Sequence, residues 1–583
     1  MKQITFSDRL RYQFDNIMSK GTIALIGWLF LVSAILIAII SLVVFITGIG
    51  PDQEVGFLDL MWMGLMRTLD AGTMGGDTGN WSYLFAMLLV TMGGIFVVST
   101  LIGILTSGIE GKLDELRKGR SFVVEANHTV ILGWSPQIFT IISELVAANA
   151  NQPRSCIAIL AEKDKVEMED EIQTKVGSTG RTRIVCRTGS PIDLRDLDII
   201  NPHSAGSIII LADDASNPDS HVIKTTLALT HNPNRRPEPY HIVAEVRDPK
   251  NVEIVRTIGG DEVDPLLVSD LISRITVQTC RQSGLSVIYT ELLDFGGDEI
   301  YFHEEPGLAG KTYEEALLAY EDSAVIGLCL TDGQVQLNPP PETKIEAGDQ
   351  VIAISQDDNT IRLSGRTNLE IKVEAIRQAS AREQSPERTL ILGWNGRGPT
   401  IISELDQYVA SGSEVMIVAD TSEEEIEMIG QSLQLRHLTV SFRSGDTTDR
   451  RTLDQLAIQT YQHVIVLSYA DQFEPQEADS HTLITLLHLR AITEQNGNSF
   501  SIVSEMLDGR NRELAEVTRA DDFIVSDKLV SLLLAQISEN KKLAAGFADR
   551  FDPDGCELYL KPAGDYVELG QPLNFYTVVE AAR

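Results

Sequence analysis

Two long stretches without a charged side chain near the start of the chain, residues 21–51 and 78–109, constrain its fold most strongly. With a rise of about 1.5 Å per residue, a helix formed by either stretch can cross a hydrocarbon core of about 30 Å. The apolar part of the first stretch is about twice as long as that of a signal peptide, and no small-residue cleavage site follows it, so we expect it to stay in the mature chain. The sequence therefore predicts two membrane spans.

The charges around these stretches predict their orientation. The basic residues on the outer sides are Lys2, Arg9, Arg11, Lys20, Lys112, Arg117, Lys118 and Arg120. The loop between the stretches instead carries five carboxylates and a single base, Arg67. Because basic residues concentrate on the cytoplasmic side of a membrane, we expect residues 1–20 and the large region after the spans to be cytoplasmic.

The loop between the spans contains a mostly apolar run, residues 56–69, followed by Asp70-Ala71-Gly72-Thr73 and by Asp77. The run is too short to span a membrane, but it fits a re-entrant helix whose irregular continuation lines a water-filled path. Several copies around an axis would form a ring of Asp70 carboxylates, which indicates a cation filter. An exposed acidic loop is the alternative. The Thr-x-Gly-Tyr-Gly filter of potassium channels is absent, so the permeant ion, potassium or calcium, stays open.

Small residues recur along the second span, with Gly93, Gly94 and Gly103 among them, and Glu110 stands near its cytosolic end. This pattern predicts either a bendable inner helix that gates the pore or close packing between helices, which small residues also promote in membranes. Both interpretations remain open at this stage.

Composition limits the remaining possibilities. A formal net charge of -35 argues against a nucleic-acid partner, because that affinity depends on Lys and Arg neutralising phosphates, and favours cations instead. The 583 residues exceed what one core can hold, so several soluble lobes must follow the membrane part. The five cysteines are scattered and form no C-x-x-C pair, which argues against a disulfide framework and a zinc site.

An internal repeat indicates two tandem copies of one domain after the spans. Residues 129–145 and 389–405 are identical at 11 of 17 positions, and the same offset aligns Asp219-Ser220-His221 with Asp479-Ser480-His481. Each copy alternates short apolar runs with helical patterns, which predicts a parallel, Rossmann-like sheet with crossover helices. The expected strands are 129–132, 157–160, 183–186, 207–211 and 241–245 in the first copy, and 389–392, 415–418, 438–442, 464–467 and 501–504 in the second.

Each copy has a candidate ligand turn after its first strand, at Gly133 and at Gly393, and an acid at the end of its second strand, Glu162 or Asp420. The fingerprint G-x-G-x-x-G is missing from both copies, so backbone amides cannot approach a pyrophosphate in the usual way. A dehydrogenase would also need a catalytic constellation, and none stands out. We therefore expect no enzymatic activity, and a nucleotide is only the second candidate ligand.

Calcium is the first candidate ligand because the soluble region is rich in carboxylates. The candidate calcium ligands are Glu162, Asp213, Asp214 and Glu245. A solvated acidic surface is the alternative. His221 and His481 follow Asp219 and Asp479, which we expect to cap a helix, so a packed histidine is favoured over a metal ligand at both positions.

A different lobe follows the first sheet, from about residue 286 to 356. Residues 268–280 and 525–537 have matching helical patterns, but only about forty residues follow the second of these. Residues 577–582 look like an interrupted helix. We therefore expect the second small lobe to be incomplete in this chain.

The order of these parts resembles channels with regulator-of-potassium-conductance (RCK) domains. The run from Gly111 to Ser121, continued by Val124 to Thr129 and Leu132 to Ser135, is similar to the Castor and Pollux family of cation channels, and Asp70-Ala71-Gly72 resembles that family's acidic filter. Plant members carry extra N-terminal spans, so the first span here would correspond to their penultimate one. The resemblance implies a homotetramer in the lipid bilayer whose eight lobes form a cytosolic gating ring, in which a bound ligand acts on the pore through the linker.

The expected fold class is thus a membrane α-helical pore of two spans and a re-entrant helix, followed by tandem α/β RCK domains with small α+β lobes. We divide the chain into a cytosolic N-terminus (1–20), a transmembrane pore domain (21–110), a linker (111–126), a first RCK domain (127–375, with its Rossmann-like lobe to about 260 and a small lobe at about 285–360) and a second RCK domain (376–583, with its Rossmann-like lobe to about 520). A ligand-gated cation channel is the favoured function, and a membrane-anchored regulatory subunit of a cation transporter is the alternative.

Overall fold

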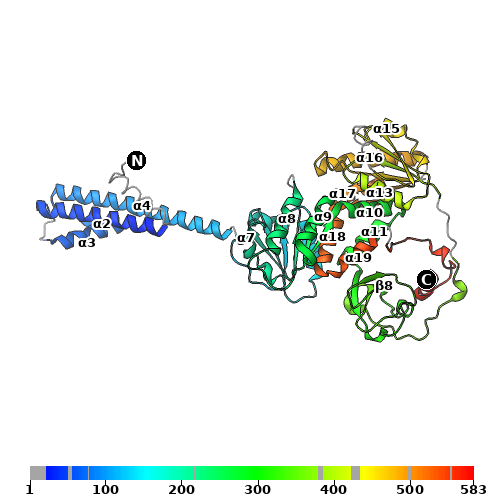
Figure 1. Cartoon of the computed structure of the whole chain (residues 1–583). Coiled ribbons are helices and arrows are strands. Elements are labelled where there is room, and N and C mark those ends of the chain that lie inside the picture. Colours follow the sequence, from blue (N-terminus) through cyan, green and yellow to red (C-terminus); the bar gives the residue numbers. More distant parts are fainter. Residues whose placement is uncertain are drawn as a thin grey trace, which may run out of the picture. The chain divides into compact units, whose positions relative to one another are not determined.

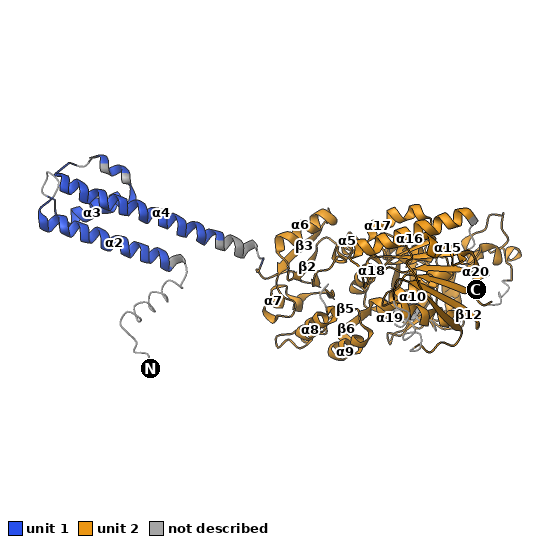
Figure 2. Ribbon diagram, turned by 90° about the horizontal axis from the view of Figure 1, so that it is seen from above, with its two compact units in different colours: residues 1–119 blue, residues 120–583 orange. Residues whose placement is uncertain are grey.

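The computed structural model divides the chain into two compact units, residues 1–119 and 120–583 (Figure 2). It describes residues 22–49, 55–76, 78–117, 119–213, 217–378, 385–421, 433–496, 500–551 and 555–583. Three elements of the sequence predictions, the N-terminus at 1–20, Asp77 and Asp214, lie outside these residues.

The described residues of the first unit contain three apolar helices that all contact one another (Figure 1). They are α2 (Thr22–Thr47), α3 (Phe57–Leu69) and α4 (Trp81–Arg117). Two segments, Ala24–Thr47 and Trp81–Glu110, are long and apolar enough to cross a membrane, as the sequence predicted. The shorter helix α3 lies between them in the chain and ends at a 3-10 turn, η1 (Ala71–Gly76).

A six-stranded parallel sheet begins the second unit. Its order is β3-β2-β1-β4-β5-β6. The strands are β1 (Thr129–Leu132), β2 (Ser155–Ala161), β3 (Thr182–Thr188), β4 (Ser207–Ile210), β5 (Ile242–Val246) and β6 (Val263–Leu267), and the helices are α5 (Ile138–Ala148), α6 (Lys165–Lys175), α7 (Leu194–Ile199), α8 (Pro218–Thr230) and α9 (Pro249–Gly259). All four residues of the central strand β1 are buried, because helices cover both faces of a parallel sheet.

A second sheet repeats this order as β13-β12-β11-β14-β15-β16, again all parallel. The strands are β11 (Arg388–Leu392), β12 (Ser413–Ala419), β13 (Leu438–Ser444), β14 (His463–Val466), β15 (Ser501–Met506) and β16 (Asp522–Val525), and the helices are α13 (Gly398–Tyr408), α15 (Arg450–Asp454), α16 (Pro475–Asn496) and α17 (Gly509–Ala515). The ten predicted strands are all present, with ends that differ by at most two residues.

Sequence analysis missed the sixth strand of each sheet, β6 and β16. Strand β6 contains Pro265, which lacks an N–H group and is tolerated because β6 pairs only with β5 at the edge of the sheet. Strand β16 has four residues and begins with Asp522. Neither segment has the apolar pattern from which the other strands were predicted.

The helix that follows each sheet packs against the other copy. Helix α10 (Val268–Arg281) contacts α13, β14, β15 and β16 of the second copy, whereas α18 (Ser526–Glu539) contacts α5, β4 and β5 of the first. Both helices are buried along most of their length. The two Rossmann-like lobes are therefore tied together by an exchange of helices.

The small lobe is a four-stranded antiparallel sheet with the order β7-β10-β8-β9. Its elements are α11 (Leu285–Leu293), β7 (Glu299–Glu304), α12 (Tyr313–Leu317), β8 (Ala324–Cys329), β9 (Val335–Leu337) and β10 (Gln350–Ser355). This lobe confirms the predicted α+β character of the region after the first sheet.

Residues 542–551 and 555–583 form no sheet of their own and instead extend the small lobe. Helix α19 (Lys542–Phe551) contacts β9, and Val567 forms an isolated β-bridge with Ile376. At the end of α20 (Phe575–Ala582), Arg583 lies 2.7 Å from Glu314 of the small lobe. The part of the chain expected to form an incomplete second lobe therefore packs onto the first one.

Candidate functional site

Asp70 lies at the C-terminal end of helix α3 and shapes the turn that follows. Its N–H donates to Met66, and its carboxylate accepts a hydrogen bond of 2.8 Å from the N–H of Gly72. The Thr73 hydroxyl donates to the main-chain oxygen of Asp70, also at 2.8 Å. The segment Asp70-Ala71-Gly72-Thr73 is thus a compact turn with an exposed carboxylate at a helix C-terminus, where the helix dipole favours cations.

The small residues of α4 have different surroundings. A Cβ atom on Gly94 would lie 2.6 Å from Cα of Thr68, and one on Gly93 would lie 3.2 Å from the Leu36 side chain. Around Gly103 there is open space, and Glu110 is exposed. At Gly94 the close approach of α3 and α4 accounts for glycine, because any side chain would separate the two helices. Gly103 remains a candidate for bending.

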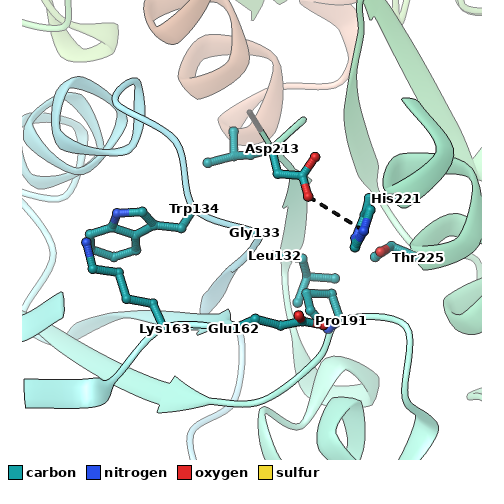
Figure 3. Close-up of a pocket in the computed structure, with 10 residues that line it drawn as sticks. Leu132, Gly133, Trp134, Glu162, Lys163, Pro191, Asp213, His221 and Thr225 are labelled. Carbon is teal, nitrogen blue, oxygen red and sulfur yellow. Dashed lines mark ion pairs between the residues drawn. The ribbon is translucent and has the colours of Figure 1, made fainter. Parts of the chain in front are cut away.

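The first Rossmann-like sheet has a cavity of about 320 Å³ at the carboxyl ends of its strands (Figure 3). It lies where the strand order reverses, between β1 and β4, which is the usual ligand position in such sheets. Its lining includes Gly133, Glu162, Asp213, His221, Lys163 and Trp134. The fold therefore brings together three of the predicted ligand residues, from the ends of three different strands.

Gly133 permits this arrangement because its φ is +104° and a Cβ atom there would lie 2.9 Å from the Leu211 carbonyl oxygen. On one side of the cavity, Asp213 and His221 point toward each other with 3.6 Å between their side chains (Figure 3). The ammonium group of Lys163 lies 4.9 Å from the ring centre of Trp134. The cavity thus presents carboxylates, an imidazole and a cation–π pair to a ligand.

Glu245 does not line this cavity. It is fully buried, and its carboxylate accepts hydrogen bonds from the N–H of Ala212 at 2.9 Å and from Arg247 at 3.3 Å. Burial raises the pKa of Glu245. Among the described residues, which exclude Asp214, no group of three or more His, Cys, Asp and Glu side chains is arranged to hold a metal ion. Only Glu162 and Asp213 of the candidate calcium ligands therefore lie together.

The prediction that Asp219 caps a helix was wrong. The cap of α8 is Asn217, whose side chain accepts from the N–H of Ser220. The buried carboxylate of Asp219 instead accepts from the N–H groups of Arg247 and Asp248, both at 2.9 Å, and so holds the turn after β5. Sequence analysis missed this role, although the repeated aspartate and the aligned turn after the fifth strand pointed to it.

The second copy repeats the same contacts with a different histidine environment. Asp479 accepts from the N–H groups of Leu507 and Asp508, at 2.9 and 3.0 Å. The ring of His481 stacks on that of Phe473 with 4.7 Å between ring centres. His481 is therefore packed against an aromatic ring, as expected, whereas its counterpart His221 faces the first cavity.

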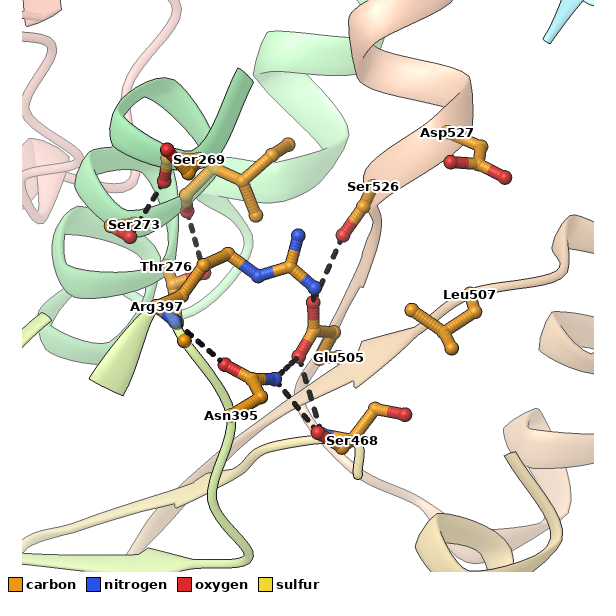
Figure 4. Close-up of polar contacts among 12 residues, drawn as sticks. Ser269, Ser273, Thr276, Asn395, Arg397, Ser468, Glu505, Leu507, Ser526 and Asp527 are labelled. Atoms are coloured by element: carbon orange, nitrogen blue, oxygen red, sulfur yellow. Dashed lines mark hydrogen bonds and ion pairs between the residues drawn. The ribbon is translucent and has the colours of Figure 1, made fainter. Parts of the chain in front are cut away.

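In the second copy, side chains that follow β11 and lie on β15 form a buried polar cluster (Figure 4). Arg397 forms an ion pair with the buried carboxylate of Glu505. The side-chain amide of Asn395 donates to Glu505 at 2.8 Å and to the main-chain oxygen of Ser468 at 2.7 Å. The hydroxyl of Ser526 completes the set with a bond of 3.1 Å to Glu505.

Gly393 and Asp420 directly follow β11 and β12 of the second copy. Gly393 has a φ of +89°, and a Cβ atom there would lie 2.2 Å from the Leu467 carbonyl oxygen, so the turn itself matches that at Gly133. The N–H of Asp420 faces the hydroxyl of Tyr469 at 3.3 Å. The two copies therefore share the backbone conformation of the turn after their first strand.

Comparisons with known proteins agree with this architecture. A family model described as Castor and Pollux, part of voltage-gated ion channel, matches residues 269–372. The probable ion channel CASTOR of Oryza sativa subsp. japonica is 29% identical over an alignment that covers 100% of this chain and 68% of the rice protein. The ion channel CASTOR of Lotus japonicus is also 29% identical, with coverages of 100% and 71%.

Among solved structures, the human SLO3 gating ring matches 72% of this chain and 83% of its own, with a TM-score of 0.50 and 13% identity. This likeness concerns the fold alone, and it confirms the predicted RCK architecture. Two candidate spans and relatives named as ion channels identify an integral membrane protein. A family model over residues 269–372 and relatives that align along the whole chain show that it is similar to the Castor and Pollux family of ion channels.

Proposed function

We propose that this protein is a ligand-gated cation channel in which four copies surround the pore and form a cytosolic gating ring. The observation that carries the proposal is the continuity of α4. This helix is the second span and extends unbroken to Arg117. The second compact unit, residues 120–583, begins at Arg120, and we call it the regulatory unit. A conformational change in the regulatory unit would therefore act on the pore helix through very few residues.

The turn after α3 is the proposed cation filter. Four exposed Asp70 carboxylates, each at a helix C-terminus, would lower the energy of a cation on the axis. Asp77 is a second candidate ring. The absence of the potassium-channel filter sequence leaves potassium and calcium as candidate permeant ions.

Apolar surface on the outer helices supports assembly of the ring. Leu227 on α8 and Ile254 on α9 are exposed, and the repeat offset places the exposed Leu487 on α16 and Leu514 on α17 at the same positions. Apolar groups repeated on the same helices of both copies fit an interface with neighbouring chains, since water-exposed apolar patches mark contact surfaces. We therefore propose that the partner on these faces is a second copy of this chain.

The cavity of the first copy is the proposed ligand site. Calcium takes six to eight oxygen ligands, so Glu162 and Asp213 would need water or other groups to complete its shell. A nucleotide would use the acid at the end of β2 to bind ribose hydroxyls. In either case the ligand opens or closes the pore only by its difference in affinity for the two ring conformations.

Single-channel recording of the purified protein in planar bilayers tests this function. We expect cation currents under potassium or calcium gradients that change when calcium or ATP is added to the side of the regulatory region. Native mass spectrometry should find four chains in the particle. A monomeric particle without conductance would overturn the proposal.

A further inference from the structure

Glu144 is a buried carboxyl group at the joint between the first Rossmann-like lobe and the small lobe. It lies on α5, is 8% exposed, and accepts a hydrogen bond of 3.0 Å from the main-chain N–H of Phe295. Phe295 belongs to the loop that connects α11 to β7, the first strand of the small lobe. One side chain thus attaches the entry to the small lobe to α5.

Helix α18, which follows the sheet of the second copy, contacts the end of α11 next to this loop. The side-chain amide of Gln536 donates to the main-chain oxygen of Leu293 at 3.2 Å, and α18 packs against both α5 and α11. The joint is therefore formed by α5, α18 and the loop between α11 and β7. Three parts of the regulatory unit meet there, so a change in this joint affects how they are held together.

The charged groups that face Glu144 come from the loop between α11 and β7, from β7 itself and from α18. They are Asp294 on the loop, Glu299 on β7 and Lys528 on α18. Burial and the two nearby acids outweigh Lys528 and the hydrogen bond from Phe295, and they raise the pKa of Glu144 to about 7. A solvent-exposed glutamate is already ionised well below this pH.

The equivalent residue of the second copy, Glu404, has different charged neighbours. Glu404 lies 3.9 Å from the guanidinium of Arg274, which α10 contributes. The motif Val-Ser-Asp stands at residues 268–270 and again at 525–527, which aligns Arg274 of α10 with the buried Ser531 of α18. The first copy therefore lacks the arginine that faces the glutamate of the second copy.

We infer that the contact between Glu144 and Phe295 is a proton-sensitive joint, which protonation of Glu144 closes and its ionisation loosens. In the closed joint the pKa of Glu144 is about 7, whereas in an open, solvated joint it returns to its ordinary value of 4.5. The closed joint therefore binds the proton more tightly. The closed joint is therefore most stable in acid and loses stability as the pH rises between these two values. Above about pH 7 Glu144 is ionised in both the closed and the open joint, so the stability of the closed joint falls no further.

Hydrogen exchange on the full chain in lipid nanodiscs tests this inference. After correction for the intrinsic exchange rate, the opening constant of a peptide covering residues 290–298 should rise about twentyfold between about pH 5.5 and about pH 7.5 and then level off. Glu144→Gln should abolish this dependence, because its side chain stays neutral. Glu404→Gln is the matched control and should keep it.

Two outcomes would overturn the inference. One is a pH-independent opening constant in the unmodified chain, which requires no variant and so decides the matter even if Glu144→Gln fails to fold. The other is an unchanged pH dependence in a folded Glu144→Gln protein.

Discussion

Arg397 and Glu505 form an ion pair in the second copy, where the first copy has Gln137 in place of Arg397. The Glu505 side chain is only 2% exposed and the Arg397 side chain 16%. In the first copy the equivalent carboxylate, Glu245, is paired with Arg247 instead, so the two copies supply the charge partner from different elements.

Arg397→Met should destabilise the second lobe by about 3–5 kcal/mol, because it leaves the Glu505 carboxylate buried without its charge partner. Hydrogen exchange at β15 measures this loss as a lower free energy of opening. The double variant Arg397→Met/Glu505→Gln should recover part of it. Arg510→Met is the control, since Arg510 is 82% exposed and solvent screens its ion pair, so little stability should be lost.

Glu162→Gln should raise the concentration of calcium or ATP needed for half-maximal change in channel activity by about tenfold, because a hydrogen bond or ion contact to a charged group contributes about 1.5–3 kcal/mol. Asp420→Asn changes the matching position of the second copy and should leave that concentration unaltered. Dose–response curves from bilayer recordings check both. Equal effects of the two variants would contradict the assignment of ligand binding to the first copy.

Asp70→Asn should lower cation conductance by about tenfold or alter the ratio of calcium to potassium permeability, because it removes a ring of charge that concentrates cations. Asp59→Asn is a control at the opposite end of α3, where Asp59 only accepts a hydrogen bond from the N–H of Gly56. Single-channel current–voltage curves in symmetrical and mixed solutions provide the measurement. Unchanged conductance and selectivity would exclude Asp70 from the filter.

Gly94→Ala should destabilise the membrane unit by about 1–3 kcal/mol, because the added methyl group meets the backbone of Thr68. Gly103→Ala, with open space around it, should leave thermal stability near that of the parent protein. Thermal unfolding in detergent compares the two. A Gly94→Ala protein of normal stability with altered gating would instead favour a hinge at Gly94.

Much of the fold could be predicted because its pattern is local. Charge-free stretches long enough to cross a bilayer and short apolar runs separated by helices are visible within windows of a few tens of residues. The edge strands β6 and β16 were missed because Pro265 and Asp522 interrupt that pattern. The cavity residues Gly133, Glu162 and Asp213 could be predicted because each follows a strand, and parallel strands bring their carboxyl ends to one edge of the sheet.

The sequence by itself determined two apolar spans, an acidic turn between them and a duplicated Rossmann-like domain, because periodicity and repetition are properties of neighbouring residues. Only the tertiary structure decided that α10 and α18 are exchanged between the copies, that Arg397 pairs with Glu505 and that Glu144 is buried at the small-lobe joint. These features depend on burial and on contacts between residues far apart in the chain, and no local pattern specifies either one.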